Sequence, residues 1–395
     1  MNILFLSNVL PYPLDAGPKV RSYYVLRYLA QNHRVTLVTF TRNADSADAI
    51  RHLESFCHAV HGVPIRRSGL QDAIHLARSF VTARPFLILR DDLRAMDEKI
   101  RAVGQTNAFD TVHADQLSTA HYALRVKNVR RVLDQHNAVW TITRRLAGQQ
   151  TSRVQRNLLE REARLVREYE AVTCAQFDHV VTVTDEDKRA LTFPEHPPRS
   201  PIPTIPICID PQETTPIAFN PTARDVICVG SMFYPPNVDG VTWFTRQVLP
   251  RVWEQSPATK FFIVGARPAA VLRALAQNEP RLVVTDYVTD TTVYLQQAAA
   301  FVVPLRAGGG MRVKILDAWA RGVPMVSTTI GAEGIEYQGN ENILIADSPD
   351  NFAKAVLHLI QDRAFAETLA RNGRGWVHAK YAWRRVYRAW DTVYP

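Results

Sequence analysis

Short apolar runs alternate with longer amphipathic runs along almost the whole 395-residue chain. Several of the short runs are apolar nearly throughout, which is typical of strands that helices cover on both faces. Strands that alternate with helices pair in parallel. The pattern therefore predicts an α/β fold made of doubly wound parallel sheets.

The expected strands fall into two series. The first series is residues 3–7, 34–40, 111–113, 132–135 and 179–184. The second series is residues 226–229, 260–264, 282–285, 300–304 and 325–328. Ligands bind parallel sheets of this kind beyond the carboxyl ends of the strands. We therefore look for functional residues in the segments that follow the strands.

Proline interrupts the alternation once, over residues 192–222. Proline continues neither a helix nor a central strand, so this segment is expected to connect two domains. We expect a first domain over residues 1–200, a linker over 201–222 and a second domain over 223–375, with a cleft between the domains. The last segment, 376–395, carries aromatic residues at helical spacing, and we expect it to be a helix that packs back towards the first domain.

Composition and charge indicate which compartment and which kinds of ligand suit the chain. No run of about 18 uncharged apolar residues is present, and the apolar start lacks a basic leader, so we expect a first strand and neither a signal peptide nor a membrane span. The four cysteines form no C-x-x-C pair and have no histidine cluster nearby, which predicts a reducing, cytoplasmic compartment and no metal site. The net charge of +9 suits an anionic ligand, a nucleic acid or an anionic membrane.

The segment "FVVPLRAGGGMRVKILDAWARGVP", residues 301–324, contains three consecutive glycines between an expected strand and an expected helix. We expect this helix to start near Met311 and to end at Arg321, before Gly322. Glycine lets successive N–H groups converge, and a helix start adds partial positive charge, so the loop suits a phosphate. Arg312 and Lys314 would add formal charge for a diphosphate.

The same segment has a plainer interpretation, a flexible loop followed by two solvated cations. Lys314 is followed by Ile315, so the segment is not a P-loop, and no G-x-G-x-x-G follows the first strand. Asp317 lies inside the expected helix. Its carboxylate either faces solvent or accepts hydrogen bonds from the hydroxyls of a sugar.

Four segments in order carry a resemblance to a known family. They are "VGSMFYPPNVDGVTWF", "FFIVGARP", "VVTDYVTD" and "VVPLRAGGGMRVKILDAWARGVPMVSTTIGAEGI". Together they resemble the second half of a glycosyltransferase of the GT-B fold, of the retaining family 4 type. The resemblance is strong over residues 226–337 and looser elsewhere. It implies two Rossmann-like domains facing a cleft.

The resemblance also implies a chemistry. It is a hexosyltransferase reaction that takes a sugar from a nucleotide-diphosphate sugar, with UDP favoured, and keeps the anomeric configuration. No cofactor and no metal are implied, because cations and helix N-termini hold the diphosphate. The acceptor would be a glycan, a lipid-linked saccharide or a small natural product.

The chain departs from the family pattern at three places. The family carries two glutamates with seven residues between them, where this chain has Gly309 and Asp317. The turn after the first strand of the second domain lacks the usual cations, which Arg312 and Lys314 would replace. Where the family holds the base, Asp286 stands in place of a glycine. The donor contacts implied are Gly17, Gly230, Ser231, Tyr287, Val288, Gly308, Gly309, Gly310, Met311, Arg312, Lys314 and Asp317.

The residues expected to bind the acceptor lie in the first half of the chain. Gly17 and Pro18 open a helix after the first strand, and the resemblance places this loop near the donor phosphate. His113 and His136 follow strand ends and, with Arg312 and Lys314, are the expected catalytic residues. The departing phosphate would take the proton of the acceptor hydroxyl. The expected acceptor contacts are Tyr12, Asp15, Lys19, Arg21 and Asn137.

Three alternatives stay open at the level of sequence. A sugar-nucleotide epimerase of GT-B architecture would need acids around the sugar, and a degenerate relative would bind the donor without catalysis. A nucleic-acid-binding protein would need a basic stripe with interleaved aromatics, which the sequence does not show. The arginine-rich stretch 125–167 is either a set of solvated helix faces or a basic rim that touches the anionic inner face of a membrane.

Overall fold

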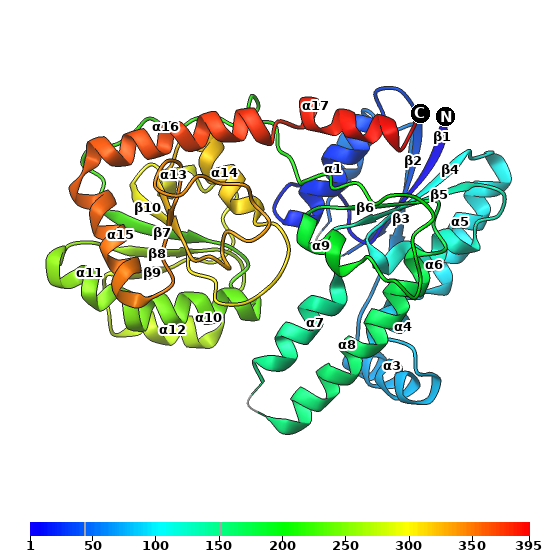
Figure 1. Cartoon of the computed structure of the whole chain (residues 1–395), viewed down its shortest axis with the longest axis horizontal. Helices are drawn as coiled ribbons and strands as arrows, with labels where there is room; N and C mark the ends of the chain where they lie inside the picture. The colour runs from blue at the N-terminus through cyan, green and yellow to red at the C-terminus, as the bar shows by residue number, and fades with distance from the viewer. Residues whose placement is uncertain (43–44, 151) are drawn as a thin grey trace. The chain divides into compact units, whose positions relative to one another are not determined.

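The computed structural model describes residues 1–42, 45–150 and 152–395, which fold into two compact units. Unit 1 is Met1–Cys208 together with Trp383–Pro395, and unit 2 is Ile209–Ala382. Each unit holds one six-stranded sheet flanked by helices (Figure 1). This two-domain α/β architecture confirms the expected fold class.

The sheet of unit 1 is parallel throughout, with the strand order β3-β2-β1-β4-β5-β6. Its strands are β1 (Asn2–Ser7), β2 (Arg34–Thr41), β3 (Ala59–Pro64), β4 (Thr111–Asp115), β5 (Arg130–Gln135) and β6 (His179–Thr182). Its helices are α1 (Gly17–Leu29), α2 (Ala47–Glu54), α3 (Gly69–Thr82), α4 (Phe86–Asp91), α5 (Arg94–Thr106), α6 (Leu117–Arg125), α7 (Val139–Gly148), α8 (Arg153–Cys174) and α9 (Asp185–Ala190). The strand order reverses between β1 and β4, so the segments that follow these two strands diverge there.

The sheet of unit 2 has the order β12-β11-β10-β7-β8-β9 and is also parallel. Its strands are β7 (Asp225–Val229), β8 (Phe261–Val264), β9 (Leu282–Val284), β10 (Ala298–Val303), β11 (Met325–Ser327) and β12 (Leu344–Ile345). Its helices are α10 (Pro235–Trp243), a π-helical turn (Phe244–Val248), α11 (Leu249–Gln255), α12 (Ala270–Gln277), α13 (Thr292–Leu295), α14 (Val313–Arg321), α15 (Pro349–Gln361) and α16 (Arg363–Lys380). Here the order reverses between β10 and β7.

Two strands were not predicted from the sequence. β3 contains His61 and Gly62 and has only Val63 fully buried, so it lacks the continuous apolar run of the other strands. β12 spans two residues. Both are edge strands of their sheets. An edge strand has a neighbouring strand on one side only, so it is less enclosed and can be less apolar.

The proline-rich connection differs from the expected linker. Residues up to Cys208 belong to unit 1, and Ile205 donates its N–H to the carbonyl of Thr182 at the end of β6. Ile202 and Ile207 are buried at 4% exposure. The isoleucines between the prolines therefore fill the core of unit 1, although the prolines keep the segment out of the sheet.

The end of the chain is not a single helix over 376–395. α16 ends at Lys380, and α17 (Trp383–Val386) and a 3-10 helix (Tyr387–Thr392) follow within unit 1. Trp383, Tyr387 and Trp390 are at most 1% exposed, so the aromatic stripe is buried as its spacing predicted. Among the described residues, no helix is both long and apolar enough to cross a bilayer.

Gly240 allows α10 to pack directly on the end of β10, and this contact can be tested. A Cβ at Gly240 would lie 2.4 Å from the carbonyl oxygen of Pro304, a backbone atom that cannot move aside. We expect Gly240→Ala to destabilise the protein by about 2 kcal/mol or more. Urea unfolding followed by circular dichroism measures the effect.

The matched control is Gly104→Ala in α5, where a new Cβ meets nothing within 4 Å. Alanine is the better helix former, so this variant should be unchanged or more stable by up to about 1 kcal/mol. Equal stability of the two variants would show that α10 does not make the close contact with Pro304.

Candidate functional site

In unit 2 the segments that follow β7 and β10 meet where the strand order reverses. A Cβ at Gly308, in the segment after β10, would lie 3.8 Å from Cβ of Pro236, at the start of α10. α14 begins at Val313, two residues later than expected, and among the described residues no side chain caps its first turn. The first-turn N–H groups of α14 and the glycine loop therefore form one region suited to an anion.

Lys314 brings a positive charge into this region. Its Nζ donates to Oδ1 of Asn237 at 3.3 Å. A Cβ at Gly230 would lie 2.8 Å from the same Nζ, so glycine is needed there to leave room for the ammonium group. Burial lowers the pKa of Lys314, and the charge of Arg312 lowers it further. A desolvated ammonium group next to a helix start gains strongly from an anionic ligand.

Arg312 acts on the glycine loop itself. Its Nη1 donates to the carbonyl oxygens of Gly309 and Gly310, the latter at 2.9 Å. Gly308 and Gly310 have φ values of +118° and +76°, which other residues adopt only with strain. The arginine thus fixes the shape of the loop, whereas we expected it to face the ligand directly.

Asp317 lies on α14 just after Lys314, with a side chain that is 43% exposed. Its carboxylate accepts from Nε of Arg321 at 3.1 and 3.2 Å, and Arg321 in turn donates to Oγ1 of Thr292 at 3.1 Å. One side of the carboxylate is held by the arginine. The exposed side can accept hydrogen bonds from hydroxyl groups.

Asp286 ties together the segments that follow β8 and β9. Its Oδ1 accepts the N–H groups of Arg267 at 3.0 Å and of Tyr287 at 2.9 Å, and its Oδ2 accepts from Arg273 at 3.0 Å. Tyr287 is left 56% exposed. The aspartate that replaces the usual glycine is therefore a structural connection between two loops.

The remaining donor contacts expected in unit 2 are placed as follows. The carbonyl of Ser231 accepts from Nδ2 of Asn237 at 3.0 Å, which links the β7 turn to the partner of Lys314. Val288 is half-buried beside Tyr287. Met311 is 7% exposed, and its side chain belongs to the core of the unit.

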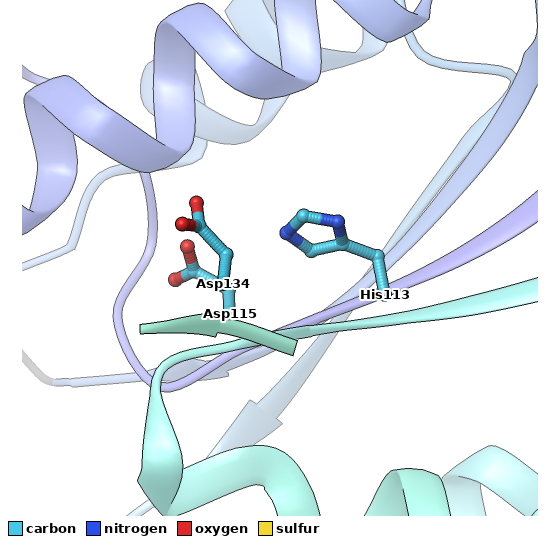
Figure 2. A group of neighbouring side chains, drawn as sticks. All are labelled: His113, Asp115 and Asp134. Carbon is cyan, nitrogen blue, oxygen red and sulfur yellow. The ribbon is translucent and has the colours of Figure 1, made fainter. Parts of the chain in front are cut away.

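In unit 1 four polar side chains share one face of the sheet at the ends of β4 and β5. Asp115 pairs with Asp134 in the register of the two strands, and side chains two residues apart point the same way. His113 and His136 therefore lie on the same face as the two aspartates. Figure 2 shows His113 with its ring directed towards Asp115 and Asp134.

Arg21 of α1 forms a buried pair with Asp134. Its Nε and Nη2 donate to the two carboxylate oxygens at 2.9 and 3.0 Å, and both side chains are 0% exposed. Burial alone would raise the pKa of Asp134, but the Arg21 guanidinium holds this pKa well below its usual range. Arg21 also donates to Tyr387 at 3.2 Å. It is therefore not the acceptor contact that we expected, because no atom of its side chain reaches the surface.

Asp115 and His136 form a second charged pair. The carboxylate accepts from Ser7 at 2.9 Å, from Ser22 at 2.8 Å and from Nε2 of His136 at 2.9 Å. Burial lowers the pKa of His136, but the two aspartates outweigh it and raise the pKa to about 9. His136 is thus an imidazolium at neutral pH. Two carboxylates and two cations make the cluster neutral as a whole.

His113 differs from His136: it lies within β4, whereas His136 directly follows β5. Its ring stacks on Phe5 at 4.2 Å, and its Nδ1 is 2.6 Å from the hydroxyl of Tyr394. Burial lowers its pKa to about 4, so the ring is neutral. His113 is 0% exposed, so its ring does not reach the surface of the structure, and its direct catalytic role stays a prediction.

His113, Asp115 and Asp134 offer ligand atoms within 4.8 Å of one another, as a metal site would. However, Arg21 occupies both oxygens of Asp134, and Ser7, Ser22 and His136 occupy those of Asp115. A metal ion would have to displace the arginine. The cluster therefore fits an internal ion-pair network better than a metal site.

The other expected residues of unit 1 lie nearer the surface. Tyr12 stacks on His52 at 4.1 Å, and Asp15 pairs with Lys19 at 2.9 Å. Gly17 is the first residue of α1. Asn137 is half-buried directly after His136. Together with the 4% exposed His136, these residues follow the carboxyl ends of β1 and β5.

The family described as "Glycosyl transferases group 1" matches residues 223–362, which include the Gly230 turn, the glycine loop and α14. Unit 2 is a group 1 glycosyltransferase domain.

Two curated relatives resemble this glycosyltransferase. A 44.6 kDa protein in the cps region of Klebsiella pneumoniae is 23% identical over 98% of this chain and 97% of its own length. A GDP-mannose-dependent α-(1-6)-phosphatidylinositol monomannoside mannosyltransferase of Mycobacterium tuberculosis is 31% identical over 34% of this chain and 39% of its own length.

Solved structures match the chain over its full length. Sucrose-phosphate synthase from Thermosynechococcus elongatus has a TM-score of 0.71 at 17% identity, covering 100% of this chain and 98% of that one. HepE from Anabaena in complex with UDP-glucose has a TM-score of 0.68 at 12% identity, covering 100% and 99%. At these identities the likeness establishes the fold, and the chain has the two-domain GT-B fold.

The Asp115–His136 pair predicts how the stability of the glycosyltransferase depends on pH. The folded pKa of about 9 lies above the value of about 6.5 expected for an unfolded histidine. The stabilisation is therefore complete below about pH 6.5 and is lost as pH rises through about 9. In the unaltered protein, this loss lowers the free energy of unfolding by on the order of 3 kcal/mol across the window. We expect His136→Asn to remove most of this pH dependence.

Urea unfolding at several pH values across the window measures this slope. His58→Asn is the control, because His58 is exposed and lies at the start of β3, away from the cluster. An unchanged slope in His136→Asn would show that the imidazolium is not stabilised by the two aspartates.

Proposed function

We propose that this glycosyltransferase moves a sugar from a nucleotide-diphosphate sugar to a hydroxyl group of an acceptor, keeping the anomeric configuration and using no bound metal. The observation that carries the proposal is the partly buried Lys314 ammonium group beside the glycine loop and the uncapped start of α14. Retention is proposed from the resemblance to the family 4 type.

The charges of unit 2 support a metal-independent reaction. When the sugar leaves, negative charge develops on the diphosphate. Lys314 and the N–H groups at the start of α14 are held in place beforehand and can stabilise that charge. Arg312 contributes by fixing the loop through the carbonyls of Gly309 and Gly310. These groups do the work that a divalent cation performs elsewhere.

For the donor, we propose a UDP-sugar. HepE, which shares the fold, was solved with UDP-glucose, whereas the partial relative from M. tuberculosis depends on GDP-mannose. In this chain we assign the ribose hydroxyls to the exposed side of Asp317 and the base to the segment 285–288. That segment is held by Asp286, and its Tyr287 is 56% exposed.

For the acceptor, we propose that unit 1 binds a glycan, a lipid-linked saccharide or a small natural product near Tyr12, Lys19 and Asn137. His136 is protonated at neutral pH, because its pKa is raised to about 9, so it is not the base that takes the acceptor proton. We propose that the departing phosphate takes this proton. The two aspartates balance the charge of His136, so we assign it to holding the ends of β4 and β5 on the acceptor side.

The direct test is release of nucleoside diphosphate from UDP-glucose and from GDP-mannose when saccharide acceptors are added. We expect one donor to be consumed only in the presence of an acceptor, and proton NMR of the product to show the anomeric configuration of the donor. Isomerised nucleotide sugar without acceptor would indicate an epimerase. An inverted product would contradict retention.

Lys314→Ala tests the diphosphate site. We expect nucleoside diphosphates to bind about tenfold to a hundredfold more weakly, because a desolvated charge is removed from the phosphates. Binding is measured by competition with a fluorescent nucleotide. Arg306→Ala is the control, since Arg306 lies in the same loop but pairs with Asp239 and is 47% exposed. Equal effects of the two variants would contradict the role of Lys314.

Asp317→Ala separates ribose from phosphate. We expect it to weaken nucleoside diphosphates about tenfold and to leave pyrophosphate unchanged, because the carboxylate contacts only the ribose. Arg321→Ala, which removes the partner of Asp317 but keeps the carboxylate, is the matched control. A parallel loss for nucleoside diphosphate and pyrophosphate would exclude the ribose role.

A further inference from the structure

Helix α3 of unit 1 turns its apolar side outward. This outward side, the α3 face, consists of Leu70, Ala73, Ile74, Ala77 and Val81. Leu70, Ile74 and Val81 are 74%, 51% and 87% exposed. A surface helix normally buries its apolar stripe against the protein, so this arrangement is inverted. A contiguous exposed apolar stripe marks an interaction surface.

The inner side of α3 is polar and is fastened to α8. Ser79 is fully buried, and its hydroxyl and carbonyl oxygens accept from Arg161 at 3.1 and 2.6 Å. The α3 face therefore points outward because specific hydrogen bonds hold the opposite side against the protein. Figure 1 shows α3 beside α8, with the end of the α7–α8 pair projecting past it.

α8 carries exposed apolar residues of its own. Val154, Leu158 and Arg161 follow one another at four and three residues, so they form one stripe along the helix. Val154 and Leu158 are 69% and 38% exposed. The Arg161 guanidinium lies 4.1 Å from the ring centre of Phe80, which is itself 53% exposed. The contact between Arg161 and Phe80 connects the two stripes.

Arginines surround this apolar surface. Exposed arginines on or next to α3, α7 and the first half of α8 include Arg66, Arg78, Arg144, Arg153, Arg156 and Arg164. α7 contains no acidic residue, α3 contains only Asp72, and the first half of α8 contains Glu160 and Glu162, so arginines outnumber acids here. An apolar helix face with cations at its sides matches a lipid surface whose phosphates are anionic.

We propose that α3 and the adjoining end of α8 dock unit 1 on an anionic membrane. The α3 face enters the boundary between headgroups and acyl chains, and the surrounding arginines contact lipid phosphates. The charge of the surroundings favours a membrane over an apolar protein partner, because an apolar contact alone requires no ring of cations. This docking goes beyond sugar transfer and does not depend on it.

Flotation of the full-length chain with lipid vesicles tests the proposal. Vesicles of phosphatidylcholine alone are compared with vesicles that also contain about 30% phosphatidylglycerol. We expect binding to the anionic vesicles, little binding to the neutral ones, and weaker binding as salt is added. Absent binding, or equal binding to both kinds of vesicle, would overturn the proposal.

The double variant Ile74→Asp, Val81→Asp places two carboxylates on the α3 face without touching the contacts to Arg161. We expect it to bind anionic vesicles at least about tenfold more weakly, with an unchanged circular dichroism spectrum. The matched control is Val271→Asp, Val293→Asp in unit 2, at positions that are 38% and 55% exposed. It should bind like the unaltered chain.

Two results of this comparison would also overturn the proposal. One is equal loss of binding in both double variants, because added negative charge anywhere would then explain the effect. The other is a change of oligomeric state in Ile74→Asp, Val81→Asp, measured by analytical ultracentrifugation, without any vesicle binding. The α3 face would then be a contact between two copies of the chain.

Discussion

The parallel pairing of the strands is the constraint on which the rest of the structure depends. Because all strands of a sheet run in the same direction, their carboxyl ends lie at the same end of the sheet. The segments that follow two neighbouring strands diverge only where the strand order reverses. In unit 2 that place lies between β10 and β7, where Gly230 leaves room for Lys314 and Gly308 leaves room for Arg312. In unit 1 it lies between β1 and β4, where Ser7 and Asp115 meet.

Both units hold charged side chains near the carboxyl ends of their strands, but only unit 1 pairs them with opposite charges of its own. Asp134 faces Arg21, and Asp115 faces His136, so the cluster needs no external partner and serves to fix the ends of the strands. Lys314 has instead the amide oxygen of Asn237, and among the described residues no carboxylate forms a salt bridge with it. A partly buried cation that lacks an internal anion suits an external one. This contrast is the reason that we propose unit 2 as the donor side.

The sequence predicted most strands and the glycine loop because these signals are local. Where a charged side chain points is not local: Arg21 lies between Val20 and Ser22 on a helix buried on most sides, and nothing nearby in sequence shows that it turns inward to Asp134. His113 and His136 also looked equivalent, yet the neighbouring aspartates give only His136 a raised pKa. The mirrored order His-x-Asp on β4 and Asp-x-His on β5 was the available signal for the cluster.

The central claim is that the glycine loop, Lys314 and the start of α14 hold a nucleoside diphosphate without a metal ion. Calorimetric titration of the unaltered chain with UDP, GDP, dTDP and ADP, each with and without EDTA, tests it most directly. The account predicts that one of the four, with UDP favoured, binds clearly more tightly than the others and that EDTA leaves its affinity unchanged. Binding that disappears with EDTA, or no binding by any of the four, would contradict it.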